Sequence, residues 1–249
     1  MSSRLDTLRV KIFADGADLD GILAMRANPL IAGFTTNPTL MRRAGVLEYE
    51  RFARQVLEAV PDRPISFEVF ADEPRDMVRQ ARVIASWGPN VNVKIPVYNT
   101  RRKFMGPILR ELSESGVTLN VTAVMTLDQV RRISKVLAPA APAIVSIFAG
   151  RIADTGVDPV PLMRFALEIL SVRPEVELLW ASPRELLNVF QADEVGCHII
   201  TATNDVLAKL SLIGRNLDDY SLETVQMFRR DAVAAGYEIA PPGRVATAV

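Results

Sequence analysis

The 249-residue sequence contains a single cysteine, Cys197, and a single histidine, His198. One cysteine cannot form an internal disulfide, and one Cys with one His cannot supply the ligands of a Cys/His zinc cluster. A Ser-His-Asp triad would have to use His198, and no nucleophile-elbow sequence accompanies it. We therefore expect lysine and carboxylate side chains to carry any chemistry. Cys197 and His198 are expected to be structural residues, on the eighth of the strands that are predicted below.

An excess of either charge is also absent, because 29 Lys and Arg residues balance 29 Asp and Glu residues. Zero net charge argues against general binding of nucleic acid or of an anionic membrane, although a local basic cluster can still hold a phosphate. No stretch approaches the roughly 18–20 uninterrupted apolar residues that span a bilayer, and residues 1–10 lack the apolar core of a signal peptide. The sequence therefore predicts a soluble, cytoplasmic protein with no nucleic-acid or membrane partner.

Short strand-like runs alternate with longer amphipathic segments along the whole chain. The runs are mostly continuous apolar segments, which is typical of parallel strands covered on both faces. Eight runs are bounded by turn residues: 10–14, 32–35, 66–70, 91–95, 118–122, 144–148, 178–181 and 198–201. Repeated strand–helix units indicate βαβ crossovers, and eight of them favour a closed barrel over an open sheet. No glycine-rich dinucleotide or P-loop motif follows the first run.

The amphipathic segments predict helices at 47–60, 75–87, 102–115, 127–137, 161–172, 183–191 and 204–209, and a last helix at 222–235. Thr126 with Gln129 resembles a capping box, and Asp158-Pro159 is typical of a helix start. No linker or change of composition divides the chain. We therefore predict an α/β fold, a single (β/α)8 TIM barrel over residues 1–239 that includes a C-terminal helix, followed by a flexible tail over 240–249.

Catalytic residues of such barrels lie at the carboxyl ends of the strands, so the polar residues there are the candidates for chemistry. Lys94 lies in the apolar run Val91–Pro96, near the mouth of the barrel because Pro96 ends the strand. Burial disfavours an ammonium group, and the neutral amine is the form that attacks a carbonyl to give a Schiff base. From its position alone, Lys94 fits this role and a structural pair with Glu68 equally well.

Neighbouring positions add further polar groups to the layer of the barrel interior that contains Lys94. Alternate residues of a strand share a face, so Asn92 points the same way as Lys94, and Asn120 the same way as Thr122. Such a layer contains more polar groups than a structural core commonly needs. This density favours a functional site at the barrel mouth.

Six segments resemble the transaldolase family in order and spacing, from about Lys11 to the last helix. The segments are Phe13-Ala14-Asp15, Gly33-Phe34-Thr35-Thr36-Asn37-Pro38, Val93-Lys94-Ile95-Pro96, Asn120-Val121-Thr122, Gly150-Arg151-Ile152 and Ala181-Ser182-Pro183-Arg184. The Thr-Thr-Asn-Pro and Val-Lys-Ile-Pro motifs are specific as a pair. These relatives are class I aldolase-type barrels in which the Schiff-base lysine lies on the fourth strand, as Lys94 does here.

The resemblance implies a role for each candidate. Lys94 would form the imine with the C2 carbonyl of a ketose, and Asp15 would exchange the proton of the C4 hydroxyl. Glu68 and Thr122 would hold a catalytic water. The substrate-binding residues would be Asn37 and Asn120 for the dihydroxyacetone unit, and Arg151, Arg184, Ser182 and Ser146 for a phosphate. The expected partners are sugar-phosphate substrates, with no metal and no organic cofactor.

Each arginine also has a simpler interpretation when it is taken alone. Arg184 could be an ordinary residue in the first turn of a helix, and Arg151 could anchor a loop. Two guanidinium groups with serines at a strand end nevertheless suit a phosphate dianion, whose oxygens they can bond bidentately. Their pairing therefore favours a phosphate site.

Three positions separate transaldolases from the related fructose-6-phosphate aldolases, which release free dihydroxyacetone. The transaldolase pattern has Glu at position 68, Asn at 120 and Phe at 148, and this sequence has Glu68, Asn120 and Phe148. Phe148 cannot hydrogen-bond a catalytic water, and its ring would shield the imine from hydrolysis. We therefore predict transfer of a dihydroxyacetone unit from a ketose phosphate to an aldose phosphate. An aldolase and a non-catalytic barrel that binds sugar phosphates remain the alternatives.

Two further segments carry open expectations. The segment Arg101-Arg102-Lys103 follows the lysine strand, and it could bind a second anionic group or begin a helix in solvent. The last helix resembles the terminal helix of short relatives, which packs across a neighbouring subunit. We therefore expect a homo-oligomer, with packing of this helix on its own barrel as the alternative.

Overall fold

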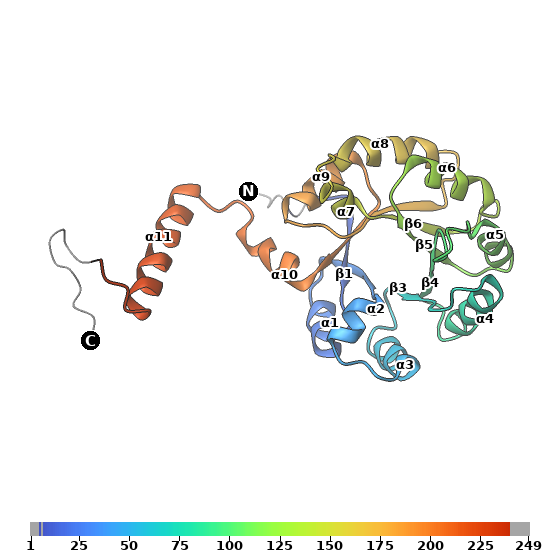
Figure 1. Cartoon of the computed structure of the whole chain (residues 1–249), viewed down its shortest axis with the longest axis horizontal. Helices are drawn as coiled ribbons and strands as arrows, with labels where there is room; N and C mark the ends of the chain where they lie inside the picture. Colours follow the sequence, from blue (N-terminus) through green and yellow to red (C-terminus); the bar gives the residue numbers. More distant parts are fainter. Residues whose placement is uncertain (1–4, 6, 240–249) are drawn as a thin grey trace.

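Eight parallel strands close into a barrel in the order of the sequence, and helices surround them (Figure 1). This computed structural model describes residues 5 and 7–239, so the tail expected over 240–249 lies outside the described residues. The strands are β1 (Lys11–Asp15), β2 (Ile31–Thr35), β3 (Ile65–Glu68), β4 (Val91–Pro96), β5 (Leu119–Val124), β6 (Ala143–Ile147), β7 (Val176–Trp180) and β8 (Ile199–Thr203). Pairing of β8 with β1 completes the ring. The predicted (β/α)8 barrel is confirmed, and each predicted strand overlaps an observed one.

The helices of the described chain vary from four to eighteen residues. They are α1 (Leu19–Arg26), α2 (Pro38–Arg43), α3 (Tyr49–Ala59), α4 (Pro74–Ala85), α5 (Gly106–Glu114), α6 (Leu127–Val136), α7 (Ala149–Ala153), α8 (Pro159–Leu170), α9 (Leu187–Val195), α10 (Asn204–Leu207) and α11 (Leu217–Ala234), with a 3₁₀ segment η1 (Ala208–Leu212). The capping box of Thr126 and Gln129 is present, and the Asp158 side chain accepts from the N–H of Val160. Both predicted helix starts are therefore confirmed.

Three predicted helix starts are wrong: the last helix, predicted from residue 222, begins at Leu217, and the other two errors concern loops at the barrel mouth. Residues 101–103 do not begin a helix, because an antiparallel bridge joins Tyr98 to Phe104 and α5 begins only at Gly106. The Asn99 side chain holds this loop by accepting from the backbone N–H groups of Arg101 and Lys103. The helix predicted over 183–191 begins at residue 187, which leaves position 184 in the loop after β7.

The barrel interior contains a small apolar cluster of its own, formed by Phe13, Ile144, Leu179, Ala181 and Ile199. The Phe13 ring fits against Gly33, where an added Cβ atom would lie 2.5 Å from the ring. Positions two residues further along the same strands share the inward face and lie nearer the carboxyl ends. The apolar cluster therefore forms a floor beneath the polar residues of the barrel mouth.

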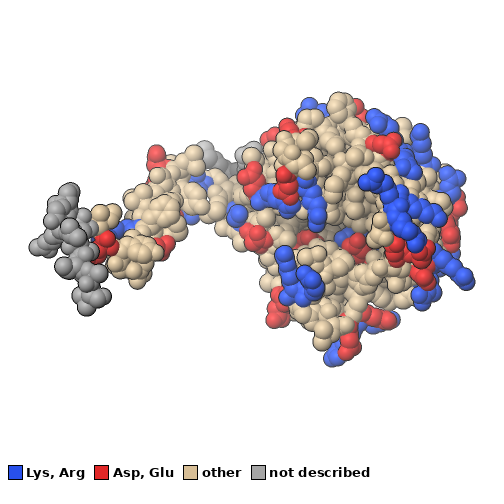
Figure 2. Space-filling model, viewed as in Figure 1, with Lys and Arg blue, Asp and Glu red and all other residues tan. Residues whose placement is uncertain are grey.

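Helix α11 lies away from the barrel (Figure 1), and none of its residues is buried. Its large apolar side chains face solvent, with Leu222, Val225 and Phe228 each more than half exposed. Packing of this helix on its own barrel, one of the two expectations, is therefore not observed. No helix in the described part of the chain has the length and apolarity that crossing a membrane requires. Positive and negative side chains are interspersed over the face of the barrel in Figure 2.

The prediction that Cys197 and His198 lie on the eighth strand is wrong, because β8 begins at Ile199, immediately after them. Cys197 is buried, and its burial raises the pKa of the thiol to about 12. His198 Nδ1 accepts a 2.9 Å hydrogen bond from the backbone N–H of Leu178. The contacts of both residues therefore fit the structural roles expected from the sequence.

Candidate active site

A cavity of about 570 Å³ opens at the carboxyl ends of the strands. Its lining includes all eleven residues predicted from the sequence: Asp15, Asn37, Glu68, Lys94, Asn120, Thr122, Ser146, Phe148, Arg151, Ser182 and Arg184. Phe148 lies one residue past the end of β6, at the N-cap of α7, and not inside the strand as predicted. The eight strands converge on this cavity, so residues far apart in the sequence meet there.

Lys94 lies on β4 with only 8% of its side chain exposed. Its Nζ atom donates a 2.7 Å hydrogen bond to the carbonyl oxygen of Thr36. The same atom lies 3.2 Å from Oε2 of Glu68, the residue paired with Lys94 in the register of β3 and β4. The amine therefore has a carboxylate within direct proton-transfer distance, inside a pocket that a small molecule can enter.

Asp15 ends β1 and is held by two neighbouring side chains. Its Oδ1 accepts from the Thr35 hydroxyl at 2.7 Å, and its Oδ2 accepts from Asn37 Nδ2 at 3.2 Å. Burial raises the pKa of this carboxyl, while the charge of Lys94 and the hydrogen bond from Thr35 act in the opposite direction. A carboxylate with a raised pKa is a stronger base than an exposed one, which suits it to accept a proton from a hydroxyl group.

Asn37 has a second, structural task. Its Oδ1 accepts from the N–H of Leu40 at 2.9 Å, which makes Asn37 the N-cap of α2. The cap therefore fixes the side chain that orients Asp15. Helix α2 was not predicted from the sequence, so the position of Arg43, which also lines the cavity, was missed.

A chain of buried polar side chains crosses the barrel from β6 to β3. Ser146 Oγ donates to Asn120 Oδ1 at 2.6 Å, and Asn120 Nδ2 donates to Ser66 Oγ at 3.0 Å. The hydroxyl of Thr122 is buried without a partner among the described residues. A buried hydroxyl is normally hydrogen-bonded, so this one is available to a water or a substrate group inside the cavity.

The arginines lie on the other side of the cavity, after β6 and β7. Arg184 donates from Nε to Asp154 Oδ1 at 2.9 Å, pairs through Nη2 with the other Asp154 oxygen, and donates from Nη1 to Ser182 Oγ at 3.2 Å. The hydrogen bonds from Arg184 lower the pKa of Asp154. Arg151 lies over the Phe148 ring at 5.5 Å from its centroid. Asp154 was missed in the sequence, because its partner Arg184 is distant along the chain and lies on another loop.

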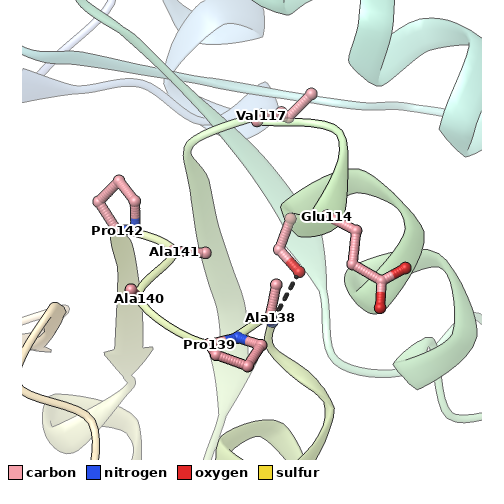
Figure 3. A pocket seen from close by; sticks show the side chains of 9 residues that line it. Glu114, Val117, Ala138, Pro139, Ala140, Ala141 and Pro142 are labelled. Atoms are coloured by element: carbon pink, nitrogen blue, oxygen red, sulfur yellow. Dashed lines mark hydrogen bonds between the residues drawn. The ribbon is translucent and has the colours of Figure 1, made fainter.

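A second cavity, of about 420 Å³, lies between the segments that lead into β5 and β6 (Figure 3). Small and apolar side chains line it, and Ser113 Oγ accepts from the N–H of Ala138 beside it. Glu114 is the one titratable side chain in its lining. No set of three or more His, Cys, Asp or Glu residues within 5 and 7–239 is placed to hold a metal ion. The barrel mouth is therefore the candidate for chemistry.

Fold and pocket together define a class of protein, a (β/α)8 barrel with a buried lysine, two carboxylates and two arginines at the carboxyl ends of its strands. A family model described as Transaldolase/Fructose-6-phosphate aldolase matches residues 12–239. The chain therefore belongs to the transaldolase/fructose-6-phosphate aldolase family, which confirms the resemblance predicted from its motifs.

Curated relatives agree with this assignment. The chain is 33% identical over 205 residues to a probable transaldolase of Dehalococcoides mccartyi, covering 81% of this chain and 90% of the relative. It is 31% identical over 231 residues to a probable transaldolase of Thermoanaerobacter sp., covering 92% of this chain and all of the relative.

Solved structures share the barrel at low sequence identity. A putative phosphonomutase from Burkholderia cenocepacia matches with a TM-score of 0.55 and 11% identity, covering 92% of this chain and 93% of that one. KGPDC from Streptococcus mutans matches with a TM-score of 0.54 and 10% identity, covering 80% and 89%. At such identities the likeness concerns the fold alone.

Proposed function

We propose that this protein is a transaldolase that transfers a dihydroxyacetone unit from a ketose phosphate to an aldose phosphate through a Schiff base on Lys94. One observation carries the proposal, namely the buried Lys94 amine 3.2 Å from the Glu68 carboxylate, in a cavity that also contains Asp15. A lysine used only for structure would not need an accessible cavity beside its amine. The family membership supports the same chemistry.

In the proposed reaction, the neutral amine of Lys94 attacks the C2 carbonyl of the ketose and forms a carbinolamine. Glu68 accepts the proton that the ammonium group gives up, and a water held between Glu68 and Thr122 carries protons while the carbinolamine loses water. The free hydroxyl of Thr122 supports this role because no described residue occupies it. The product of this stage is a protonated imine, which can accept an electron pair.

Cleavage of the bond between C3 and C4 follows. Asp15 takes the proton of the C4 hydroxyl, the C4 fragment leaves as an aldehyde, and the electron pair of the broken bond enters the imine to give an enamine. The enamine then attacks the aldehyde of the acceptor, and Asp15 returns its proton to the new hydroxyl. Hydrolysis of the resulting imine releases the new ketose phosphate and frees Lys94.

The remaining residues of the cavity are proposed to bind the substrate. Asn37 and Asn120 hydrogen-bond the dihydroxyacetone unit, and Arg151, Arg184 and Ser182 bind the phosphate. The hydrogen bond from Ser146 to Asn120 favours a role for Ser146 in orienting that amide over contact with the phosphate. Phe148 adds an apolar surface beside the imine, which disfavours attack by water and favours transfer over release.

Turnover of fructose 6-phosphate with and without erythrose 4-phosphate tests this proposal. A transaldolase consumes the donor only when the acceptor is present, whereas an aldolase releases dihydroxyacetone without it. Lys94→Met is expected to abolish turnover, and Lys135→Met, at an exposed position near the end of α6, serves as the matched control. Binding of the donor without turnover in either assay would instead indicate a non-catalytic barrel.

Helix α11 supports a second part of the proposal, a homo-oligomer built from copies of this chain. Its exposed apolar residues, including Val225 and Phe228, make up a surface that the described barrel leaves uncovered. Truncation after Asn216 is therefore expected to convert an oligomer into a monomer in sedimentation experiments. A full-length chain that is monomeric at micromolar concentration would contradict this part.

A further inference from the structure

The guanidinium group of Arg184 is held from behind by a residue that does not line the cavity. Arg184 and Ser182 are lining residues, whereas Asp154 is not. Asp154 receives hydrogen bonds from Nε and Nη2 of Arg184, and Ser182 Oγ receives one from Nη1 at 3.2 Å. An arginine has five N–H donors, so this arrangement leaves one free on each terminal nitrogen.

The position of Asp154 is not explained by local stability. It is the C-cap residue of α7, where the carboxylate is near the negative end of the helix dipole. About half of each side chain in the pair is exposed, and exposed ion pairs contribute little to stability. The pair therefore calls for an explanation other than stabilisation of α7.

The backbone around the pair is constrained as well. The N–H of Gly150, in the first turn of α7, donates to the carbonyl oxygen of Ala181 at 3.3 Å, and Ser182 has a φ of 63°, which non-glycine residues rarely adopt. A Cβ atom on Gly150 would lie 1.5 Å from the Ser182 carbonyl oxygen. Helix α7 therefore meets the loop after β7 at two points, Gly150 at one end and Asp154 at the other.

We propose that Asp154 is a positioning residue that holds the Arg184 guanidinium so that its two free N–H groups bind a phosphate group of the substrate. This inference rests on the proposed function, since it assigns how that site recognises a phosphorylated sugar. The bidentate contact with Asp154 fixes the plane of the guanidinium, and a fixed fork binds two phosphate oxygens with less loss of side-chain freedom. Asp154 itself does not touch the substrate.

Asp154→Asn tests this role through binding and kinetics. Isothermal titration with fructose 6-phosphate is expected to show a Kd raised by about 10-fold, since a displaced Arg184 guanidinium loses one of its two hydrogen bonds to the phosphate. The KM for fructose 6-phosphate rises by a similar factor, while kcat/KM for unphosphorylated fructose is unchanged. Asp154→Glu, which keeps the charge, is expected to restore part of the affinity. The matched control is Asp158→Asn, which makes the same charge change and keeps a side chain able to cap α8.

Arg184→Met combined with Asp154→Asn completes the test. Because Asp154 acts through Arg184, the double variant is expected to bind fructose 6-phosphate no more weakly than Arg184→Met alone. An unchanged or lower Kd in Asp154→Asn, or equal losses for fructose and fructose 6-phosphate, would overturn the inference. A third outcome separates the two claims: Asp154→Asn weakens the phosphate-dependent binding, but the wild type shows no turnover. That outcome would support the inference about Asp154 and refute the proposed function.

Discussion

Gly150→Ala perturbs the closest approach between α7 and the loop after β7. The added Cβ atom would lie 1.5 Å from the carbonyl oxygen and 2.6 Å from the carbonyl carbon of Ser182, and both are backbone atoms. Carbon and oxygen normally approach to about 3.3 Å, so the two segments must separate by roughly 2 Å. Overpacking of this kind costs about 1–3 kcal/mol, with larger values when the backbone has to move.

Two measurements follow from this displacement. For a domain of this size each kcal/mol lowers the Tm by about 2–4 °C, so calorimetry is expected to show a loss of about 2–12 °C. Displacement of Ser182 and Arg184 by more than 1 Å is expected to lower kcat/KM for fructose 6-phosphate by about 100-fold.

Gly16→Ala is the control for Gly150→Ala. A Cβ atom at Gly16 would have nothing within 4 Å, and the residue does not have a positive φ. This control variant is expected to keep the wild-type Tm to within about 2 °C. A Gly150→Ala protein with wild-type Tm and wild-type kcat/KM for fructose 6-phosphate would refute the reasoning, because the two segments could then not be in the contact described.

Three other variants concern Asp15, Thr122 and His198. Asp15→Asn should raise the Tm at pH 7 and leave it unchanged below pH 3.8. Burial raises the pKa of Asp15, so its carboxylate destabilises the fold as pH rises through that pKa. Cleavage of the bond between C3 and C4 of the ketose should slow by about 10²–10⁴-fold in this variant. Thr122→Val removes the buried hydroxyl that is proposed to hold the catalytic water, so imine formation measured by single-turnover kinetics should slow. Partial desolvation lowers the pKa of His198, so its contribution to stability is complete above pH 6.5 and is lost as pH falls through the lowered pKa. His198→Asn should remove that part of the acid sensitivity in thermal scans. A steeper loss in the variant would contradict this.

The barrel and most of its site could be predicted from the sequence for a physical reason. Parallel strands buried on both faces require continuous apolar runs, so residues such as Val93 and Ile95 mark their strand without any tertiary information. Polar residues at the ends of such runs, Lys94 among them, must then face either the barrel interior or solvent. The closed order of the strands brings these residues to one cavity.

The features that were missed depend on contacts between loops. Helix α7 has only five residues, too few for an apolar period, so its C-cap residue Asp154 could not be placed beside Arg184. The loop containing Arg102 is not helical, because the Asn99 side chain and the bridge from Tyr98 hydrogen-bond the backbone groups that a helix would use. The detached position of α11 cannot be predicted either, because its apolar residues have the pattern of any helix that covers a core.

Trapping of the covalent intermediate tests the central claim most directly. The protein is incubated with fructose 6-phosphate, reduced with borohydride and digested, and its peptides are analysed by mass spectrometry. A dihydroxyacetone-derived adduct is expected on the peptide that contains Lys94, and none in Lys94→Met. An adduct on a different lysine, or none while fructose 6-phosphate binds in the cavity, would contradict it.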